Sequence, residues 1–298
     1  MTHGTVLITG RYGFTGRYVA KALADDGWQV FGISSHTPSV DDPLNYELDL
    51  TDPAAVTKAV SEIRPDAVIH LAAIAFIAHN NTNDFYHTNL IGTRNLLQAL
   101  SDEGCGGKGV ILASSANIYG NAKMSYVHEA AHPSPKNDYA VSKLAMEYMA
   151  KLYREQFPIL ITRPFNYTGI GQDPKFIVPK IVSHFREKEP TIHLGNIDVS
   201  RDFSDVRDVA KIYRDLLGSE KSWGETVNIC SGKAISIREV IELCSTISEH
   251  ELDVVMNRDL VRDEEISILA GDPKKLDAIL PKLDRHTFEQ TLRWMLSE

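Results

Sequence analysis

The chain has 298 residues, of which 43% are hydrophobic and 24% are charged, as is ordinary for a globular protein. Its 31 Lys and Arg residues against 40 Asp and Glu residues give a formal net charge of −9, which argues against nucleic acid as a partner. The length suits one large α/β unit or two lobes.

Short apolar runs alternate with helical patterns through the first half of the chain. Thr51 or Asp52 is expected to cap a helix that has Pro53 in its first turn. The alternation predicts an α/β fold with a doubly wound, mostly parallel Rossmann sheet. In chain order we expect a strand at 5–9, a helix at 16–26, a strand at 29–34, a helix at 53–63, a strand at 67–72, a helix at 89–100, a strand at 109–114, a helix at 139–156 and a strand at 158–162.

Prolines divide the second half into shorter pieces, with a strand expected at 225–230 and a helix at 237–248. We interpret this half as a smaller C-terminal α/β lobe that binds substrate. The predicted division assigns residues 1–165 and about 203–232 to a dinucleotide-binding domain. It assigns about 166–202 and 233–298 to the smaller lobe.

Neither a metal site nor a disulfide framework is expected, because the spacing of Cys105, Cys230 and Cys244 suits neither. Buried free thiols in a reducing cytoplasm are predicted instead. No basic region precedes the first apolar run, and the most apolar stretch, at 68–78, is too short to span a bilayer. We therefore expect a cytoplasmic protein without a membrane partner.

A glycine-rich loop follows the first expected strand. Gly10, Gly13 and Gly16 have the spacing Gly-x-x-Gly-x-x-Gly and lead into a helix. These glycines permit a tight turn, a close approach of the backbone to a pyrophosphate, and close packing of the helix on the strand. The free N–H groups at the start of the helix can then bind the phosphates. The loop predicts a dinucleotide site.

The second expected strand ends without the acidic residue that would bind the ribose 2′-hydroxyl of NAD. Ser34 and Ser35 stand there, and Arg11 in the glycine loop is the nearest cation. Hydroxyls and a cation suit a 2′-phosphate, so the sequence favours NADP(H), with NAD(H) as the alternative. In the alternative case the serines only begin a loop and Arg11 is solvated.

Tyr139 and Lys143 lie four residues apart at the start of an expected helix and therefore share a face. An ammonium beside the phenol is expected to lower the tyrosine pKa, so that Tyr139 could exchange a proton with a carbonyl or alcohol oxygen. Ser115 follows the buried strand at 109–114, at the edge where ligands bind in open α/β sheets. Each signal is weak alone, but together, in this order and on these elements, they are much stronger than any one of them.

The order of these motifs resembles the extended short-chain dehydrogenase/reductase family. The matching pieces are Thr9-Gly10-x-x-Gly13-Phe14-x-Gly16, Asp49-Leu50-Thr51-Asp52, His70-Leu71-Ala72-Ala73, Asn89-x-x-Gly92-Thr93, Ser114-Ser115-x-x-x-Tyr119-Gly120, Tyr139-x-x-x-Lys143 and Arg163-Pro164-Phe165-Asn166. The resemblance implies that Ser115, Tyr139 and Lys143 are catalytic. It also implies a set of cofactor-binding residues: Gly10, Arg11, Tyr12, Gly13, Phe14, Ser34, Ser35, Asp49, Leu50, Leu71, Ala72, Ala73, Asn89, Lys143 and Pro164.

The second half carries the segments Phe176-Ile177-Val178-Pro179-Lys180, Leu194-Gly195-Asn196-Ile197-Asp198-Val199-Ser200-Arg201-Asp202-Phe203 and Val261-Arg262-Asp263-Glu264-Glu265-Ile266, followed by Gly271-Asp272-Pro273. These segments resemble a narrower group, the GDP-mannose 4,6-dehydratases and the GDP-4-keto-6-deoxy-D-mannose reductases. By this resemblance Arg201 and Arg262 clamp the pyrophosphate of a nucleotide sugar, as arginine suits bidentate phosphate contacts. Lys180, Asn196 and Glu265 hold its nucleoside. Asn117 and Asn166 complete the implied substrate contacts. Asp263 departs from the pattern, because the related proteins often have Pro there.

Dehydration, reduction and epimerisation can be distinguished by a few residues. In the related dehydratases a Glu stands two residues after the catalytic Ser or Thr, whereas this chain has Asn117, whose amide cannot accept a proton. Dehydration is therefore disfavoured. A reductase needs only a hydride donor and a proton from Tyr139. We expect NADPH-dependent reduction of the C4 ketone of GDP-4-keto-6-deoxymannose to a GDP-6-deoxyhexose of the D-rhamnose or 6-deoxytalose type.

Other functions stay open at this point. A nucleotide-sugar 4-epimerase with tightly bound NAD would use the same triad, and a dTDP- or UDP-sugar 4-ketoreductase would differ only in its base contacts. A protein that binds the dinucleotide without catalysis would be expected to lack Tyr139 or Lys143. The resemblance also implies a homodimer that forms through the helices expected at 89–100 and 139–156.

Overall fold

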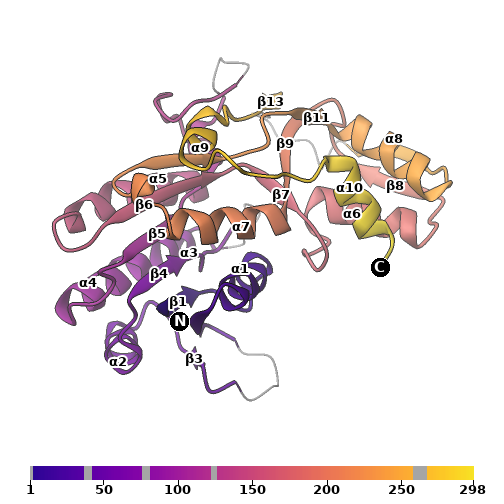
Figure 1. The fold of residues 1–298 in the computed structure, drawn as a ribbon. Helices are drawn as coiled ribbons and strands as arrows, with labels where there is room; N and C mark the ends of the chain where they lie inside the picture. Colours follow the sequence, from indigo (N-terminus) through magenta and orange to yellow (C-terminus); the bar gives the residue numbers. More distant parts are fainter. Residues whose placement is uncertain (1–2, 37–41, 76–80, 122–125, 258–266) are drawn as a thin grey trace.

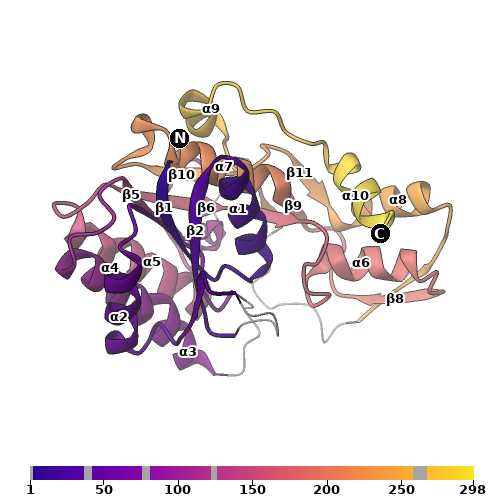
Figure 2. The ribbon, with the colours of Figure 1, turned by 60° about the horizontal axis from the view of Figure 1, so that its bottom comes forward.

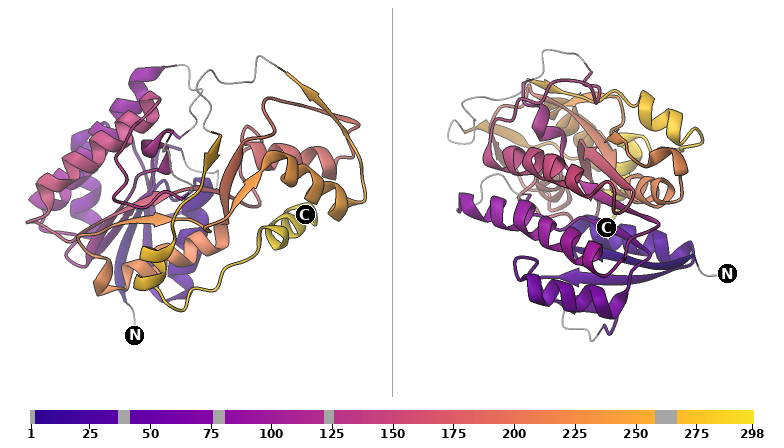
Figure 3. Two further views of the ribbon diagram at one scale, coloured as in Figure 1. Left: turned by 90° about the horizontal axis from the view of Figure 1, so that it is seen from above. Right: turned by 90° about the vertical axis from the view of Figure 1, so that its left-hand side faces the viewer.

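The structure of the protein, a computed structural model, describes residues 3–36, 42–75, 81–121, 126–257 and 267–298. These residues form a larger lobe around one parallel sheet and a smaller lobe beside it (Figure 1). In Figure 3 the smaller lobe lies to one side of the sheet, and it is formed by segments from the second half of the chain. The predicted fold class is confirmed.

The larger lobe is built on a sheet that has seven strands within the described residues, in the order β10-β6-β5-β4-β1-β2-β3. Every pairing in it is parallel. Strands β1, β4 and β5 are largely or fully buried, which explains why they appear in the sequence as apolar runs. The strands are β1 (Gly4–Thr9), β2 (Trp28–Ser34), β3 (Asn45–Glu47), β4 (Ala67–His70), β5 (Gly109–Ala113), β6 (Ile159–Pro164) and β10 (Thr226–Ile229).

Helices cover both faces of this sheet (Figure 2). One face carries α2 (Pro53–Ile63), α4 (Thr93–Asp102) and α5 (Asp138–Ala150), whose apolar residues share a core with the strands. The other face carries α1 (Phe14–Asp25), α7 (Val206–Leu217) and α9 (Lys274–Ile279). Because all strands are parallel, their carboxyl ends lie at one edge of the sheet, where ligands bind in folds of this kind.

The smaller lobe has its own core between short strands and three helices. Strand β9 is central, because it pairs with β7, β11 and β13, while β8 pairs with β12. The elements are β7 (Asn166–Thr168), α6 (Ile177–Arg186), β8 (Thr191–Leu194), β9 (Ser200–Asp205), β11 (Ala234–Ser236), α8 (Ile237–Ser248), β12 (Asp253–Met256), β13 (Ile268–Leu269) and α10 (Phe288–Leu296).

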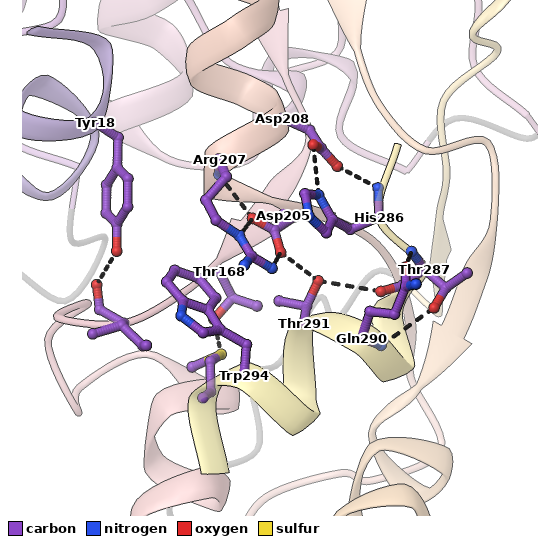
Figure 4. A network of polar contacts seen from close by, with 12 residues as sticks. Tyr18, Thr168, Asp205, Arg207, Asp208, His286, Thr287, Gln290, Thr291 and Trp294 are labelled. Atoms are coloured by element: carbon purple, nitrogen blue, oxygen red, sulfur yellow. Dashed lines mark hydrogen bonds and ion pairs between the residues drawn. The ribbon is translucent and has the colours of Figure 1, made fainter. Parts of the chain in front are cut away.

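A polar network joins α10 to the start of α7 (Figure 4). Asp205 ends β9, and its carboxylate accepts hydrogen bonds from the backbone and guanidinium of Arg207 and, at 2.7 Å, from the hydroxyl of Thr291. The guanidinium carbon of Arg207 lies 3.7 Å from the centroid of the Trp294 ring. These contacts hold the C-terminal helix of the smaller lobe to a helix that covers the main sheet.

Most predicted elements are found, several of them with shifted ends. The helix expected at 53–63 is α2, and Asp52 is its cap. The helix expected at 89–100 is α4, preceded by α3 (Thr82–Tyr86) and the π-helical turn η1 (His87–Gly92). The helix expected at 139–156 ends at Ala150 and continues only as the short 3₁₀ turn η3 (Lys151–Tyr153). The strand expected at 67–72 ends at His70.

The predicted division into two domains stays a prediction. β10 joins the main sheet, whereas β9, which spans residue 203, pairs among the described residues with strands of the smaller lobe. Cys105, Cys230 and Cys244 are buried free thiols. Within the described ranges, no helix is both long and apolar enough to cross a membrane.

Candidate active site

The glycine loop turns sharply between β1 and α1. Gly10 has a φ of +71°, a conformation that residues with a Cβ atom rarely adopt. A Cβ atom on Gly16 would lie 2.1 Å from the carbonyl oxygen of Gly10, so the first turn of α1 needs a glycine there. Gly13 is the N-cap of α1, and no side chain in the described part of the protein caps this helix. The exposed N–H groups therefore suit the pyrophosphate of a dinucleotide.

Arg11 crosses the end of β2 and is already paired. Its Nη1 lies 3.2 Å from the carboxylate of Asp42 and donates to the carbonyl oxygen of Leu44 at 3.3 Å. The hydroxyl of Tyr12 donates to the same carboxylate at 2.5 Å. Sequence reasoning looked for an acid only where β2 ends and missed Asp42, which lies in the following loop. Asp42 holds Arg11 beside Gly32, over the strand whose last residue is Ser34.

Most of the other residues predicted to contact the cofactor follow the carboxyl ends of the strands, whereas Asn89 lies in η1 and Pro164 ends β6. Ser34 is buried and Ser35 exposed, while Asp49 is exposed and accepts a hydrogen bond from the backbone of Thr51 at 2.8 Å. The Phe14 ring stacks on Tyr167, with 6.0 Å between centroids. Partly buried members of the set are Tyr12, Leu71, Ala72, Ala73 and Pro164, while Leu50 and Asn89 are buried.

His70 lies at the centre of a buried chain of hydrogen bonds. The Thr93 hydroxyl donates to the carbonyl oxygen of Asn89, so the Thr93 oxygen accepts the proton of His70 Nε2, with 2.7 Å in each contact. His70 Nδ1 then accepts the proton of the Thr9 hydroxyl at 2.7 Å. The Thr9 oxygen accepts in turn from the backbone N–H of Ala72. Burial lowers the pKa of His70 to about 3, which keeps the ring neutral.

Asn89 continues this chain to the helix that carries the tyrosine. Its side chain accepts from the backbone N–H of Ile74 at 2.9 Å and donates to the hydroxyl of Ser142 at 3.1 Å. The Ser142 hydroxyl donates to the carbonyl oxygen of Tyr139 at 2.8 Å. The segment after β4 is thereby tied to the first turn of α5. The motif match pointed to Asn89 as a cofactor contact but not to this connection.

Ser115, Tyr139 and Lys143 come together at the carboxyl end of β5. Ser115 is the N-cap of the 3₁₀ turn η2 (Ala116–Tyr119), and its hydroxyl acts to lower the pKa of the neighbouring Tyr139. Lys143 lies one turn further along α5 and donates from Nζ to the carbonyl oxygen of Ala113 at 2.7 Å. All three side chains are almost fully buried. The residue types and their placement allow proton exchange with an oxygen atom of a bound substrate.

The electrostatics differ from the expectation that Lys143 lowers the pKa of Tyr139. Burial raises the pKa of Tyr139 to about 12, against the opposing effect of the hydrogen bond from Ser115. Burial also lowers the pKa of Lys143 to about 8, while the nearby Glu147 raises it. The expectation was wrong because the loss of hydration dominates the pKa of Tyr139, and the ammonium of Lys143 is not among the groups that shift it but donates to the carbonyl oxygen of Ala113. Tyr139 therefore keeps its proton at neutral pH.

The residues predicted to bind substrate are spread over two regions. Asn117 bonds Ser115 through both its backbone N–H and its side-chain amide, at 3.2 Å each, and Asn166 begins β7. Lys180 donates to the carbonyl oxygen of His193, and Arg201 to that of Ser200. Asn196 lies between β8 and β9, where its side chain accepts from the backbone of Asp198. Arg262 and Glu265 lie outside the described residues.

Two buried acidic residues near this edge were given no role by sequence reasoning. Glu147 pairs with Arg163 through two contacts of 2.9 and 2.7 Å, and both side chains are at most 8% exposed. Asp202, beside Arg201, accepts from Ser231 and from the backbone of Gly232 and Gly271. The partners are far apart in sequence, so no local pattern could reveal these contacts. Across the described ranges, no group of three or more His, Cys, Asp or Glu residues could hold a metal ion.

Comparison with known sequences gives a family and many relatives, two of which are named for GDP-6-deoxyhexoses. The model of the NAD dependent epimerase/dehydratase family matches residues 6–230. GDP-6-deoxy-D-talose 4-dehydrogenase of Aggregatibacter actinomycetemcomitans is 37% identical over 276 residues, which are 92% of this chain and 90% of the relative. GDP-6-deoxy-D-mannose reductase of Pseudomonas aeruginosa is 34% identical over 304 residues, 98% of this chain and 96% of the relative.

Solved structures share the fold over almost the whole chain. The structure of RMD from Pseudomonas aeruginosa complexed with NADPH has a TM-score of 0.86 and 34% identity, and the match covers 98% of this chain and 97% of that one. The UDP-glucose 4-epimerase of Thermus thermophilus in complex with NAD has a TM-score of 0.88 and 25% identity, with 98% of each chain covered.

Proposed function

The chain belongs to the NAD dependent epimerase/dehydratase family, and we propose that within it the protein reduces the C4 ketone of GDP-4-keto-6-deoxymannose with NADPH. The product is a GDP-6-deoxyhexose of the 6-deoxytalose or D-rhamnose type, the two sugars in the names of its relatives. At the coarser level, the chain is an NAD(P)-dependent nucleotide-sugar oxidoreductase, as those relatives are named dehydrogenase and reductase.

One observation carries the proposal for reduction: a buried Tyr139 that keeps its proton lies beside the buried Ser115 at the carboxyl edge of the sheet. Ketone reduction needs a proton donor for the oxygen atom that becomes a hydroxyl. When bound, the cofactor supplies the hydride that reaches C4. Tyr139 gives its proton to the C4 oxygen, Ser115 donates a hydrogen bond to the same oxygen, and Lys143 places a positive charge beside them.

The proposed cofactor is NADP(H), with NAD(H) as the alternative. The glycine turn and the uncapped start of α1 support a dinucleotide of either kind. Arg11 and Ser34 would hold the 2′-phosphate, because a guanidinium and a hydroxyl suit that anion. The relative solved with NADPH supports this choice. In the proposed division of labour, residues 1–165 and about 203–232 bind the cofactor, and about 166–202 and 233–298 bind the nucleotide sugar.

The GDP-sugar is proposed from the relatives and from the charges near the smaller lobe. Arg201 on β9 would bind the pyrophosphate, as would Arg262. The predicted nucleoside contacts are Lys180, Asn196 and Glu265. Elimination of water is disfavoured because the residue bonded to Ser115 is Asn117, whose amide cannot act as a base. The likeness to an NAD-bound epimerase keeps 4-epimerisation as the second candidate.

Two further expectations belong to the proposal. A homodimer would form through α4 and α5, since the outer face of α5 leaves Tyr148 60% exposed and the following turn leaves Leu152 75% exposed. Burial of such side chains between two copies is favourable. The cytoplasm is the proposed location, because all three cysteines are free thiols.

The test generates GDP-4-keto-6-deoxymannose from GDP-mannose with a separate dehydratase and adds this protein with NADPH or NADH. We expect the absorbance of NADPH to fall as a GDP-6-deoxyhexose forms, and the NMR couplings at C4 to identify the product. Tyr139→Phe should abolish turnover while leaving NADPH binding intact. Interconversion of two sugar nucleotides without net consumption of either cofactor would instead establish the epimerase and refute reduction.

A further inference from the structure

The hydroxyl of Ser115 accepts two hydrogen bonds from one neighbouring residue, which decides how it can interact with other groups. A serine hydroxyl offers one proton and two acceptor lone pairs. Its oxygen accepts from the backbone N–H of Asn117 and from the side-chain Nδ2 of the same residue, with 3.2 Å in both contacts. Ser115 is 6% exposed, so water has little access to it. With both lone pairs engaged, the hydroxyl can act only as a donor.

The remaining proton of Ser115 is free to point toward Tyr139. The Ser115 hydroxyl acts to lower the pKa of the neighbouring Tyr139, as a proton directed at the phenol oxygen does, although burial raises that pKa overall. Ser115 therefore directs its proton toward the oxygen of Tyr139. In the proposed reaction this is also the place where the ketone oxygen must lie to receive a proton.

We infer that Asn117 is a positioning residue, which acts by holding the Ser115 hydroxyl as a donor toward the oxygen atoms of Tyr139 and substrate. This role replaces the predicted one, in which Asn117 contacts the substrate. The inference rests on the proposed reductase function. It follows from the amide N–H of Asn117, since a carboxylate of nearly the same shape would accept the proton of Ser115 instead.

Asn117→Asp is the sharpest test because it keeps the size of the side chain and removes the donor. An ionised carboxylate would draw the Ser115 proton away from Tyr139. We expect kcat for reduction to fall about 100-fold, the loss typical of removing one donor to the reacting oxygen. The KM for the sugar nucleotide and the Kd for NADPH, measured by fluorescence titration, should stay within about twofold, since Asn117 touches neither in this account.

The pH dependence separates positioning from a structural role. A protonated carboxyl group carries an O–H and can donate to Ser115, as the amide does. The activity of Asn117→Asp relative to wild type should therefore rise as the pH is lowered toward the ordinary pKa of aspartic acid. Asn117→Ala is the matched control, because alanine has no group that titrates at this position. It should lose about tenfold in kcat, because the backbone N–H still engages one lone pair, and its activity relative to wild type should not change with pH.

The outcomes are distinguishable from failure of the proposed function. If wild type does not reduce the ketone, the reductase proposal fails. If wild type reduces it and both Asn117 variants keep its kcat, or raise KM with kcat unchanged, the positioning role is wrong and the reductase stands. If Asn117→Asp does not fold, Asn117→Ala carries the test: a tenfold loss in kcat with unchanged KM and Kd supports the inference, and an unchanged kcat overturns it.

Discussion

His70 should make the protein sensitive to acid. Its ring is fully buried, donates from Nε2 to Thr93 and accepts at Nδ1 from Thr9, so no lone pair remains for a second proton. Burial lowers its pKa from 6.5 to about 3, and the nearby Lys143 acts in the same direction. Between these values the unfolded chain binds a proton that the folded protein does not, so stability is lost as the pH falls below 6.5.

The size of this loss follows from the two pKa values. At pH 5 an unfolded histidine is almost fully protonated, while the folded His70 remains neutral. At about 1.4 kcal/mol per pH unit below 6.5, the folded state loses about 2 kcal/mol relative to neutral pH through this one residue. The loss would continue toward the pKa of the folded state. Carboxylates titrate over the same range, so the effect must be read as a difference between wild type and a variant.

The assay is urea unfolding of wild type and His70→Gln at pH 7.5 and pH 5.0, followed by tryptophan fluorescence. The variant should be less stable at pH 7.5 by about 1–3 kcal/mol, because Thr9 and Thr93 lose well-placed partners. Between the two pH values wild type should lose about 2 kcal/mol more than the variant. His193→Gln, an exposed change on β8, is the control and should follow wild type. Equal losses for wild type and His70→Gln would refute the reasoning.

Three further predictions follow from charged groups at the site. The kcat/KM for reduction should fall as the pH rises through about 8, because Lys143 loses its proton there. Lys143→Arg should show no such fall. A flat wild-type profile of kcat/KM from pH 7 to 10 would contradict this prediction. Glu147→Ala should destabilise the fold by about 3–5 kcal/mol in urea unfolding, because Arg163 would remain buried without its partner, and adding Arg163→Met should recover part of the loss. Arg11→Ala should weaken the binding of NADPH about 10- to 100-fold in fluorescence titration, with little effect on the binding of NADH. An equal loss of affinity for both cofactors would show that Arg11 does not bind the 2′-phosphate.

Elements with strong local signals could be predicted from the sequence. The helix at 53–63 has both ends where expected, because Asp52 accepts from two N–H groups of the first turn and Pro53 suits that position. The helix at 237–248 also matches, and its first turn carries a capping box formed by Ser236 and Glu239. The parallel strands were found because burial on both faces leaves continuous apolar runs.

Elements set by tertiary contacts could not be predicted. The helical pattern continues past Ala150, but Tyr153 and Phe157 turn inward to the core and draw the chain into a 3₁₀ turn. β3 and β7 have three residues each, too few for a periodic signal. The motifs identified single residues of the site but not their partners. Asp42, which pairs with Arg11, lies 31 residues from it along the chain, and only the folded structure brings them together.

The central claim is that hydride reaches C4 of the sugar and that the cofactor is consumed. It is tested most directly by supplying NADPH deuterated at the transferable position, together with GDP-4-keto-6-deoxymannose, and locating the label in the product by NMR and mass spectrometry. Our account predicts one deuterium at C4, one equivalent of NADP⁺ per product, and no labelled product with Tyr139→Phe. A product without deuterium at C4, or sugar conversion without formation of NADP⁺, would contradict it.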